Sequence, residues 1–211
     1  MLRAGEVYEN PVTGERAVIR IGTDTTGGEL LVVDTAVRPG GAVMGEHIHP
    51  EMEERFTILR GRVSFRLAGR VAIAEPGDKL IAPPGTPHDW WNAGSEEAVV
   101  RFEMRPAARF EAMIRNAFGL AMDGKVNKVG MPNLLQLAVF AREFADVIQF
   151  THPPRIVQRM LFGLLTPLAR LLGYRGSYPE YLTRGPSSTI SVEPLPVTAS
   201  ASDSTAESST M

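Results

Sequence analysis

The chain has 211 residues, 44% of them hydrophobic, with no cysteine and a formal net charge of −2. With this net charge, the chain has no excess of positive charge that would attract nucleic acid. The lack of cysteine excludes disulfides, zinc–thiolate sites and cysteine nucleophiles. The length supports one domain, or one domain with a sizeable appendage. The first residues, Met-Leu-Arg-Ala-Gly-Glu, lack the apolar run of a signal peptide, so we expect a cytoplasmic protein.

Short apolar runs punctuated by glycine and proline fill the region from residue 18 to about 105. Runs of this kind, rich in β-branched and aromatic residues, predict the strands of a sandwich or barrel. The predicted strands are 17–21, 30–37, 43–49, 54–59, 63–67, 71–74, 79–82, 88–92 and 98–104.

Three of the four histidines fall within this strand-rich region, in two short stretches. His47 and His49 are separated by one residue, and side chains at i and i+2 of a strand point to the same face. Glu54 follows after a turn, while Pro83-Pro84-Gly85 makes a rigid turn that delivers His88 onto another strand. Three neutral imidazoles and one carboxylate make a site suited to Fe, Mn, Ni, Cu or Zn, with positions left for water or substrate.

These stretches resemble the two sequence motifs of the cupin superfamily. The first family motif is Gly, five residues, His-x-His, three or four residues, Glu, six residues, Gly; the second is Gly, five residues, Pro-x-Gly, two residues, His, three residues, Asn. The matching residues are Gly41, His47, His49, Glu54 and Gly61 in the first motif, and Gly77, Pro83, Gly85, His88 and Asn92 in the second. Glu53 also satisfies the three-residue variant, but only Glu54 leaves six residues before Gly61, so Glu54 is the better ligand.

The resemblance covers residues 33–104 and implies a mainly β fold, a cupin-type jelly-roll β-barrel with the metal inside one end. It implies that one divalent transition metal ion, Fe, Mn, Ni or Zn, is bound by four ligands, His47, His49, Glu54 and His88. It also makes Glu54 a candidate base as well as a ligand, as in some quercetin-dioxygenase-like cupins.

The family resemblance leaves the activity open. Cupins include dioxygenases, isomerases, epimerases, lyases, polyketide cyclases and seed-storage proteins, so the fold alone decides little. We expect a metal-dependent, oxygenase-like enzyme acting on a small organic molecule, because a complete ligand set lies in a barrel that a helical segment could shield. The alternatives are a non-redox isomerase, lyase or cyclase that uses the metal as a Lewis acid, and a non-catalytic protein that binds a small ligand.

From residue 106 the apolar residues follow a helical period. We predict helices at 107–122, where Asp123-Gly124 stops the first, at 134–150 after Pro132, and at 155–173 after Pro153-Pro154. These helices could cover an open face of the barrel, form a dimer interface or close over the pocket as a lid.

The predicted elements divide the chain into three parts. We expect a cupin barrel at 1–105 and a helical extension at 106–184 that packs on the barrel or on a partner subunit, in a homodimer. Residues 185–211 are mostly Ser, Thr, Pro and Ala, which cannot bury enough apolar surface to offset their ordering entropy, so we expect a disordered tail.

The third predicted helix, 155–173, also resembles an interfacial membrane helix flanked by arginines. It is too short, and too interrupted by Arg159, Pro167 and Arg170, to span a bilayer. We therefore expect it to pack on protein rather than to associate with a membrane.

Three residues near or beyond the motifs also carry predictions. Trp90 shares strand parity with His88 and could line the pocket, whereas Trp91 should face the opposite way. Packing in the core explains either tryptophan about as well as contact with a substrate. His152 lies far from the motifs, before a helix-like stretch, and is interpreted as a surface or capping residue.

Overall fold

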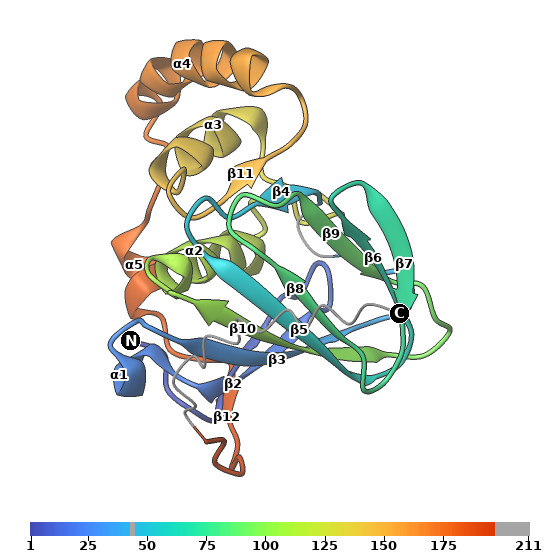
Figure 1. Cartoon of the computed structure of the whole chain (residues 1–211). Coiled ribbons are helices and arrows are strands. Elements are labelled where there is room, and N and C mark those ends of the chain that lie inside the picture. Colours follow the sequence, from blue (N-terminus) through green and yellow to red (C-terminus); the bar gives the residue numbers. More distant parts are fainter. Residues whose placement is uncertain (43–44, 197–211) are drawn as a thin grey trace.

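The computed structural model describes residues 1–42 and 45–196. In this part of the chain, two antiparallel β-sheets share a hydrophobic core, and α3 and α4 stack beyond one end of the sheets (Figure 1). The larger sheet has the order β12-β1-β2-β3-β10-β5-β8, and the smaller has the order β11-β4-β9-β6-β7. The strands are β1 Glu6–Glu9, β2 Arg16–Ile21, β3 Leu31–Val37, β4 His47–Ile48, β5 Glu53–Arg60, β6 Val63–Leu67, β7 Arg70–Ala74, β8 Lys79–Ala82, β9 His88–Asn92, β10 Ala98–Arg105, β11 Gln149–Phe150 and β12 Ser188–Thr189.

Strand residues alternate between the core and the outer face, as half-buried strands require. In β10, Ala98, Val100, Phe102 and Met104 are buried, whereas the residues between them are only partly covered. Phe102 meets Trp90 of the smaller sheet, with ring centroids 5.6 Å apart. The two sheets therefore pack through their inward side chains, and the predicted mainly β, jelly-roll type of fold followed by helices is confirmed.

Gly61 makes the tight turn between β5 and β6. Its φ is +80°, and a Cβ at this position would lie 2.7 Å from the Cα of Ala98. Glycine alone satisfies both the left-handed conformation and the close approach. The turn at Gly61 therefore fixes the end of β5, the strand that carries Glu54.

The nine predicted strands correspond to β2–β10, and eight of them end within one residue of the predicted bounds. The exception is the strand predicted at 43–49: β4 spans His47–Ile48, and residues 43–44 lie outside the described residues. Three short strands, β1, β11 and β12, were not predicted.

Five helices lie in the described residues, and three of them correspond to the predicted ones. The helix predicted at 134–150 is too long, because α3 ends at Glu143 and the chain then turns. The turn itself contributes three buried side chains, Phe144, Val147 and Ile148. The apolar spacing therefore continues past the end of the helix. The helices are α1 Thr23–Thr26, α2 Phe110–Met122, α3 Leu134–Glu143, α4 Arg155–Leu171 and α5 Pro179–Thr183.

The helices differ in what they pack against. Met113 and Phe118 of α2 and Phe140 of α3 belong to the same core cluster as the strands. In contrast, α4 packs mainly on α3. The expected packing of the helical extension on the barrel therefore holds for α2 and α3, and packing on a partner subunit stays a prediction. No helix in the described residues is long and apolar enough to cross a membrane.

The predicted boundary of the disordered tail, at residue 185, lies too early in the chain, because the strand β12 follows it. β12 pairs with β1, and the backbone N–H of Ser187 donates to the carbonyl of Val7 at 2.8 Å. This polar segment is ordered because the free edge of β1 supplies backbone partners, which do not depend on large apolar side chains. Residues 197–211, the rest of the predicted tail, lie outside the described residues.

Candidate metal centre

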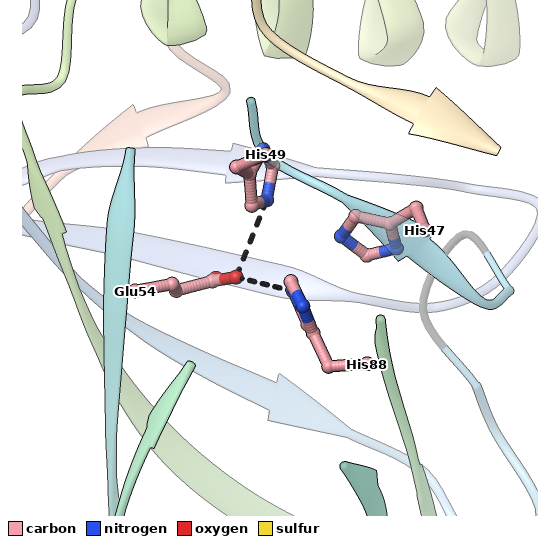
Figure 2. A group of neighbouring side chains, drawn as sticks. All are labelled: His47, His49, Glu54 and His88. Carbon is pink, nitrogen blue, oxygen red and sulfur yellow. Dashed lines mark hydrogen bonds and ion pairs between the residues drawn. The ribbon is translucent and has the colours of Figure 1, made fainter. Parts of the chain in front are cut away.

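The structure brings the four predicted ligands together inside the protein. His47 lies opposite His88 in the paired strands β4 and β9, and His49 follows β4 directly. Glu54 reaches the same place from β5 of the larger sheet. One ligand atom of each residue lies within 4.8 Å of the others, and all four side chains are buried (Figure 2).

The motif residues that are not ligands hold the ligand-bearing segments in place. The N–H of Gly85 donates to the carbonyl of His49 at 2.7 Å, from a turn in which Gly85 has a φ of +75°. The buried side-chain amide of Asn92 donates to the carbonyls of Val37 and Glu96, each at 2.8 Å. The two motifs are therefore linked by backbone hydrogen bonds as well as by strand pairing.

Each site histidine uses Nδ1 to hydrogen-bond a backbone carbonyl. The pairs are His47 with Gly45 at 2.7 Å, His88 with Thr86 at 2.9 Å and His49 with Val147 at 2.6 Å. A carbonyl oxygen can only accept, so Nδ1 carries the proton in each ring and Nε2 is left for a ligand. These bonds set the tautomer and the ring orientation that a metal-binding histidine needs.

The Glu54 carboxylate lies between two of the imidazoles. Its Oε2 is 2.9 Å from Nε2 of His88 and 3.3 Å from Nε2 of His49, the two contacts dashed in Figure 2. Burial opposes the charged carboxylate, but the hydrogen bonds with His49 and His88 outweigh it and lower the pKa of Glu54 below its usual range. Glu54 is therefore ionised at neutral pH.

The two strand histidines respond differently to the same surroundings. Burial opposes the charged form of His88, yet the hydrogen bond to Glu54 raises its pKa above the usual value. At His47, burial and then the charges on His88 and His49 lower the pKa to about 3. His47 is therefore a neutral nitrogen donor at neutral pH.

The donor set fits a divalent transition metal ion. Three Nε2 atoms and a carboxylate oxygen converge on one region, and their lone pairs repel unless a proton or a cation lies between them. Protons can bridge Glu54 to His49 and His88, but a single cation satisfies all four donors at once. Imidazole and carboxylate are ligands that Fe, Mn, Ni and Zn accept, so the residues present fit the predicted ion.

Nearby titratable residues take no part in this group. Glu53, the other carboxylate compatible with the motif, accepts a hydrogen bond from Nε of Arg55 at 2.6 Å and is partly exposed. The side chain of His152 is 83% exposed, which confirms the prediction of a surface residue.

A cavity opens beside the ligands and is lined mainly by apolar side chains. Trp90 lines it from β9, as strand parity predicted, whereas Trp91 is only partly buried and lies beneath the guanidinium of Arg66. Phe110 and Met113 line the cavity from α2, so this helix covers the centre. The polar residues in the lining, apart from the candidate ligands, are Tyr8, Glu15, Thr35 and Arg115.

The helical extension contributes two groups to the metal centre that the sequence motifs do not predict. Val147 supplies the carbonyl that orients His49, and the ring of Phe110 lies 6.0 Å from that of His49, centroid to centroid. A helical period marks Phe110 as part of an apolar stripe, but it does not say which surface the stripe covers. A backbone carbonyl leaves no signal in the sequence.

Comparison with protein families agrees with this geometry. Residues 33–103 match the family model described as a cupin domain, and this segment contains both motifs and all four candidate ligands. Residues 33–103 are therefore a cupin domain. The helices α2–α5 lie outside the matched segment, so the cupin domain accounts for the candidate ligands but not for the helices around them.

Individual proteins resemble only part of the chain. Polyketide synthase CurC of Streptomyces cyaneus is 33% identical over 72 residues, which are 34% of this chain and 46% of that protein, so the match spans less than half of this curated relative. The solved structure of an uncharacterized conserved protein with a double-stranded beta-helix domain from Klebsiella pneumoniae aligns with a TM-score of 0.39 and 23% identity, over 51% of this chain and 84% of that one. A predicted oxalate decarboxylase from Thermotoga maritima aligns with a TM-score of 0.44 and 20% identity, over 49% of this chain and 92% of that one.

Proposed function

We propose that this cupin is a metal-dependent enzyme of the oxygenase type that acts on a small organic molecule. The observation that carries the proposal is the buried group of three histidines and one glutamate beside an apolar cavity. A bound ion would supply Lewis-acid chemistry and, if it is iron, the means to activate O₂. Four protein ligands leave open positions on a six-coordinate ion, so substrate can reach it.

The lining of the cavity favours a substrate that is largely hydrocarbon or aromatic. Leu31 and Phe102 from the sheets, with Phe110 and Met113 from α2, are among the side chains that such a molecule would meet. In the described residues the lining contains one arginine, Arg115, and this is already paired with Glu111 at 3.2 Å. A strongly anionic substrate would therefore find few charged partners other than the metal.

Glu54 is a candidate base as well as a ligand. Its lowered pKa keeps the carboxylate ionised, and only one of its oxygens is occupied by the contacts with His49 and His88. The α2 side chains over the centre would limit the access of water, so that a proton taken from the substrate stays within the site.

The resemblance to CurC favours a second candidate, a non-redox cyclase, isomerase or lyase. The name of that protein places it in polyketide synthesis. Polyketide intermediates are carbon chains with oxygen substituents, which suit an apolar cavity with a metal at one side. Such a reaction needs a Lewis acid and a base but no O₂.

The first test is metal content. We predict that purified, reconstituted protein retains about one equivalent of Fe, Mn, Ni or Zn per chain, and that His49→Ala and His88→Ala lose it while circular dichroism shows an intact β fold. His152→Ala is the matched control, because this exposed histidine should leave the metal in place. Elemental analysis that finds no metal after reconstitution would contradict the proposal.

The second test separates the two reaction classes with a panel of aromatic and polyketide-like ketones. An oxygenase consumes O₂ with the Fe(II) protein and stops when Zn(II) replaces iron, whereas turnover by the Zn(II) protein without O₂ supports the second candidate. In metal-saturated protein, Glu54→Gln should lower turnover on the order of 10²-fold or more if Glu54 is also the base. If Glu54 is a ligand only, metal affinity should fall more than turnover.

A further inference from the structure

α4 carries a row of large apolar side chains that remain exposed to solvent. Ile156, Met160, Leu164, Leu168 and Leu171 have exposed fractions of 65%, 66%, 77%, 49% and 85%. They recur every three or four residues, so they form one stripe along the length of the helix. We call these five residues the α4 stripe.

The α4 stripe faces away from the rest of the protein. Phe162, Thr166 and Ala169 are the buried residues of α4, and the helix packs mainly on α3. Figure 1 shows α4 at the outer end of the molecule, with α3 between it and the sheets. A contiguous apolar surface of this kind marks a site of contact with another surface.

The charge beside the α4 stripe is entirely positive. α4 contains Arg155, Arg159 and Arg170 and no acidic residue. At 3.6 residues per turn, Arg159 and Arg170 lie between the buried face and the α4 stripe, whereas Arg155, in the first turn, lies on the side of the buried residues. Arg142 of α3 lines the same groove between the helices. No described residue forms an ion pair with any of these four arginines.

The charges on and around α4 help to decide which kind of surface the α4 stripe contacts, a second copy of the chain or a membrane. The acidic residues at the end of α3, Glu143 and Asp146, already pair with Arg109, at 2.6 and 3.1 Å. Two copies of α4 laid together would therefore bring charge of one sign only, with no acidic residue of α4 to pair with the arginines. An anionic surface with an apolar interior complements both features, since apolar side chains can enter the acyl layer while arginines meet lipid phosphates.

We propose that α4 binds the surface of a bilayer that contains anionic lipids. The helix lies in the plane of the interface, with the α4 stripe turned towards the acyl chains, and it does not span the bilayer. The sequence alone favoured packing on the barrel or on a second subunit, whereas the exposed α4 stripe and the arginines that flank it favour lipid.

The test is flotation of the metal-loaded full chain with vesicles. The protein should bind vesicles of phosphatidylcholine with phosphatidylglycerol, bind weakly or not at all to phosphatidylcholine alone, and be released by salt. Absence of binding to the anionic vesicles overturns the proposal. Equal binding to both kinds of vesicle would show that the arginines do not select anionic lipids, which contradicts the proposal.

Two pairs of variants locate the binding surface. Met160→Gln/Leu164→Gln should abolish binding, whereas Val71→Thr/Ile73→Thr, at comparably exposed positions on β7, should leave it unchanged. Arg159→Gln/Arg170→Gln should weaken binding about 30-fold, the scale of two arginines at an anionic surface. Arg38→Gln/Arg70→Gln removes the same charge elsewhere and should have little effect. Metal content unchanged in all four variants shows that they fold.

Sedimentation velocity without lipid tests whether a second copy of the chain covers the α4 stripe instead. A chain that is monomeric, or whose oligomer persists in Met160→Gln/Leu164→Gln, agrees with a lipid-facing helix. If the chain forms an oligomer that this variant dissociates, and the protein does not bind vesicles, the α4 stripe is an interface with a second copy and the proposal is wrong.

Discussion

At the scale of single residues, His88 is hydrogen-bonded at both ring nitrogens. Its partners are the carbonyl of Thr86 and the carboxylate of Glu54, each at 2.9 Å. Both partners can only accept when Glu54 is ionised, so the metal-free site favours a protonated His88, in keeping with its raised pKa. A metal ion that binds Nε2 must displace this proton.

Metal affinity should therefore depend on pH in a defined direction. We predict that it falls by at least about tenfold per unit as the pH drops below the raised pKa of His88, and levels off above it, because each ion releases at least one proton. His47, with a pKa of about 3, should release none at neutral pH. Competition with a chelator of known proton affinity measures this slope, and an affinity that is flat from about pH 6 to pH 8 would show that His88 binds metal without losing a proton.

The ligands could be predicted from the sequence, but their hydrogen-bond acceptors could not. Strand geometry predicts that His47 and His49 share a face, and the resemblance to the two cupin motifs adds Glu54 and His88. The acceptor for His49 is a carbonyl 98 residues away, at Val147, and any residue type offers the same carbonyl. Its position depends on how the helical extension folds back, which no local pattern encodes.

At the scale of elements, the turn after α3 joins the helical extension to the metal centre. β11 pairs with β4, so the strand that carries His47 is held by β9 on one side and by β11 on the other. Phe144 anchors this turn and is fully buried in the common core. A two-residue strand is too short to show a period of two, so the apolar residues up to 150 were interpreted as a continuation of the helix.

We predict that Phe144→Ala weakens metal binding as well as stability. The cavity should lower the free energy of unfolding by about 3–5 kcal/mol, and the displaced turn should disturb the hydrogen bond from His49 to Val147. Phe162→Ala is the control, because it removes a buried phenylalanine of α4 that lies outside the core cluster containing Phe144. Denaturant unfolding and metal titration of both variants check this, and equal losses of metal affinity would place the effect in general destabilisation.

At the scale of the whole molecule, the C-terminal segments return to the sheets that begin the chain. Tyr181 of α5 is buried in the common core, and its hydroxyl donates to Asp123, just after α2, at 2.7 Å. β12 then extends the larger sheet at β1. The barrel at 1–105 and the extension at 106–184 can be separated by period in the sequence, yet they share one core in the structure. This return could not be predicted, because β12 pairs through backbone groups in a segment poor in large apolar residues.

The return of the chain predicts where the C-terminus can be shortened. Deletion of 197–211, which holds no aromatic residue, should leave the unfolding temperature unchanged. Deletion of 187–211 also removes β12 and the packing of Leu195 on the buried residues Ile21, Leu30 and Val32. The lost contacts amount to about 2 kcal/mol, which should lower the unfolding temperature by about 4–8 °C for a chain of this size.

Thermal unfolding of the two shortened chains beside the full one measures this difference, with Leu195→Ala in the full chain as the matched single change. Leu195→Ala should reproduce part of the loss, since it leaves β12 and its backbone pairing with β1 in place. Metal content should be the same in all of them, because β12 lies at the edge of the larger sheet, with four strands between it and β5, which carries Glu54. If the chain ending at residue 186 unfolds at the temperature of the full chain, the segment adds nothing to the stability of the fold, and the pairing of β12 with β1 is incidental.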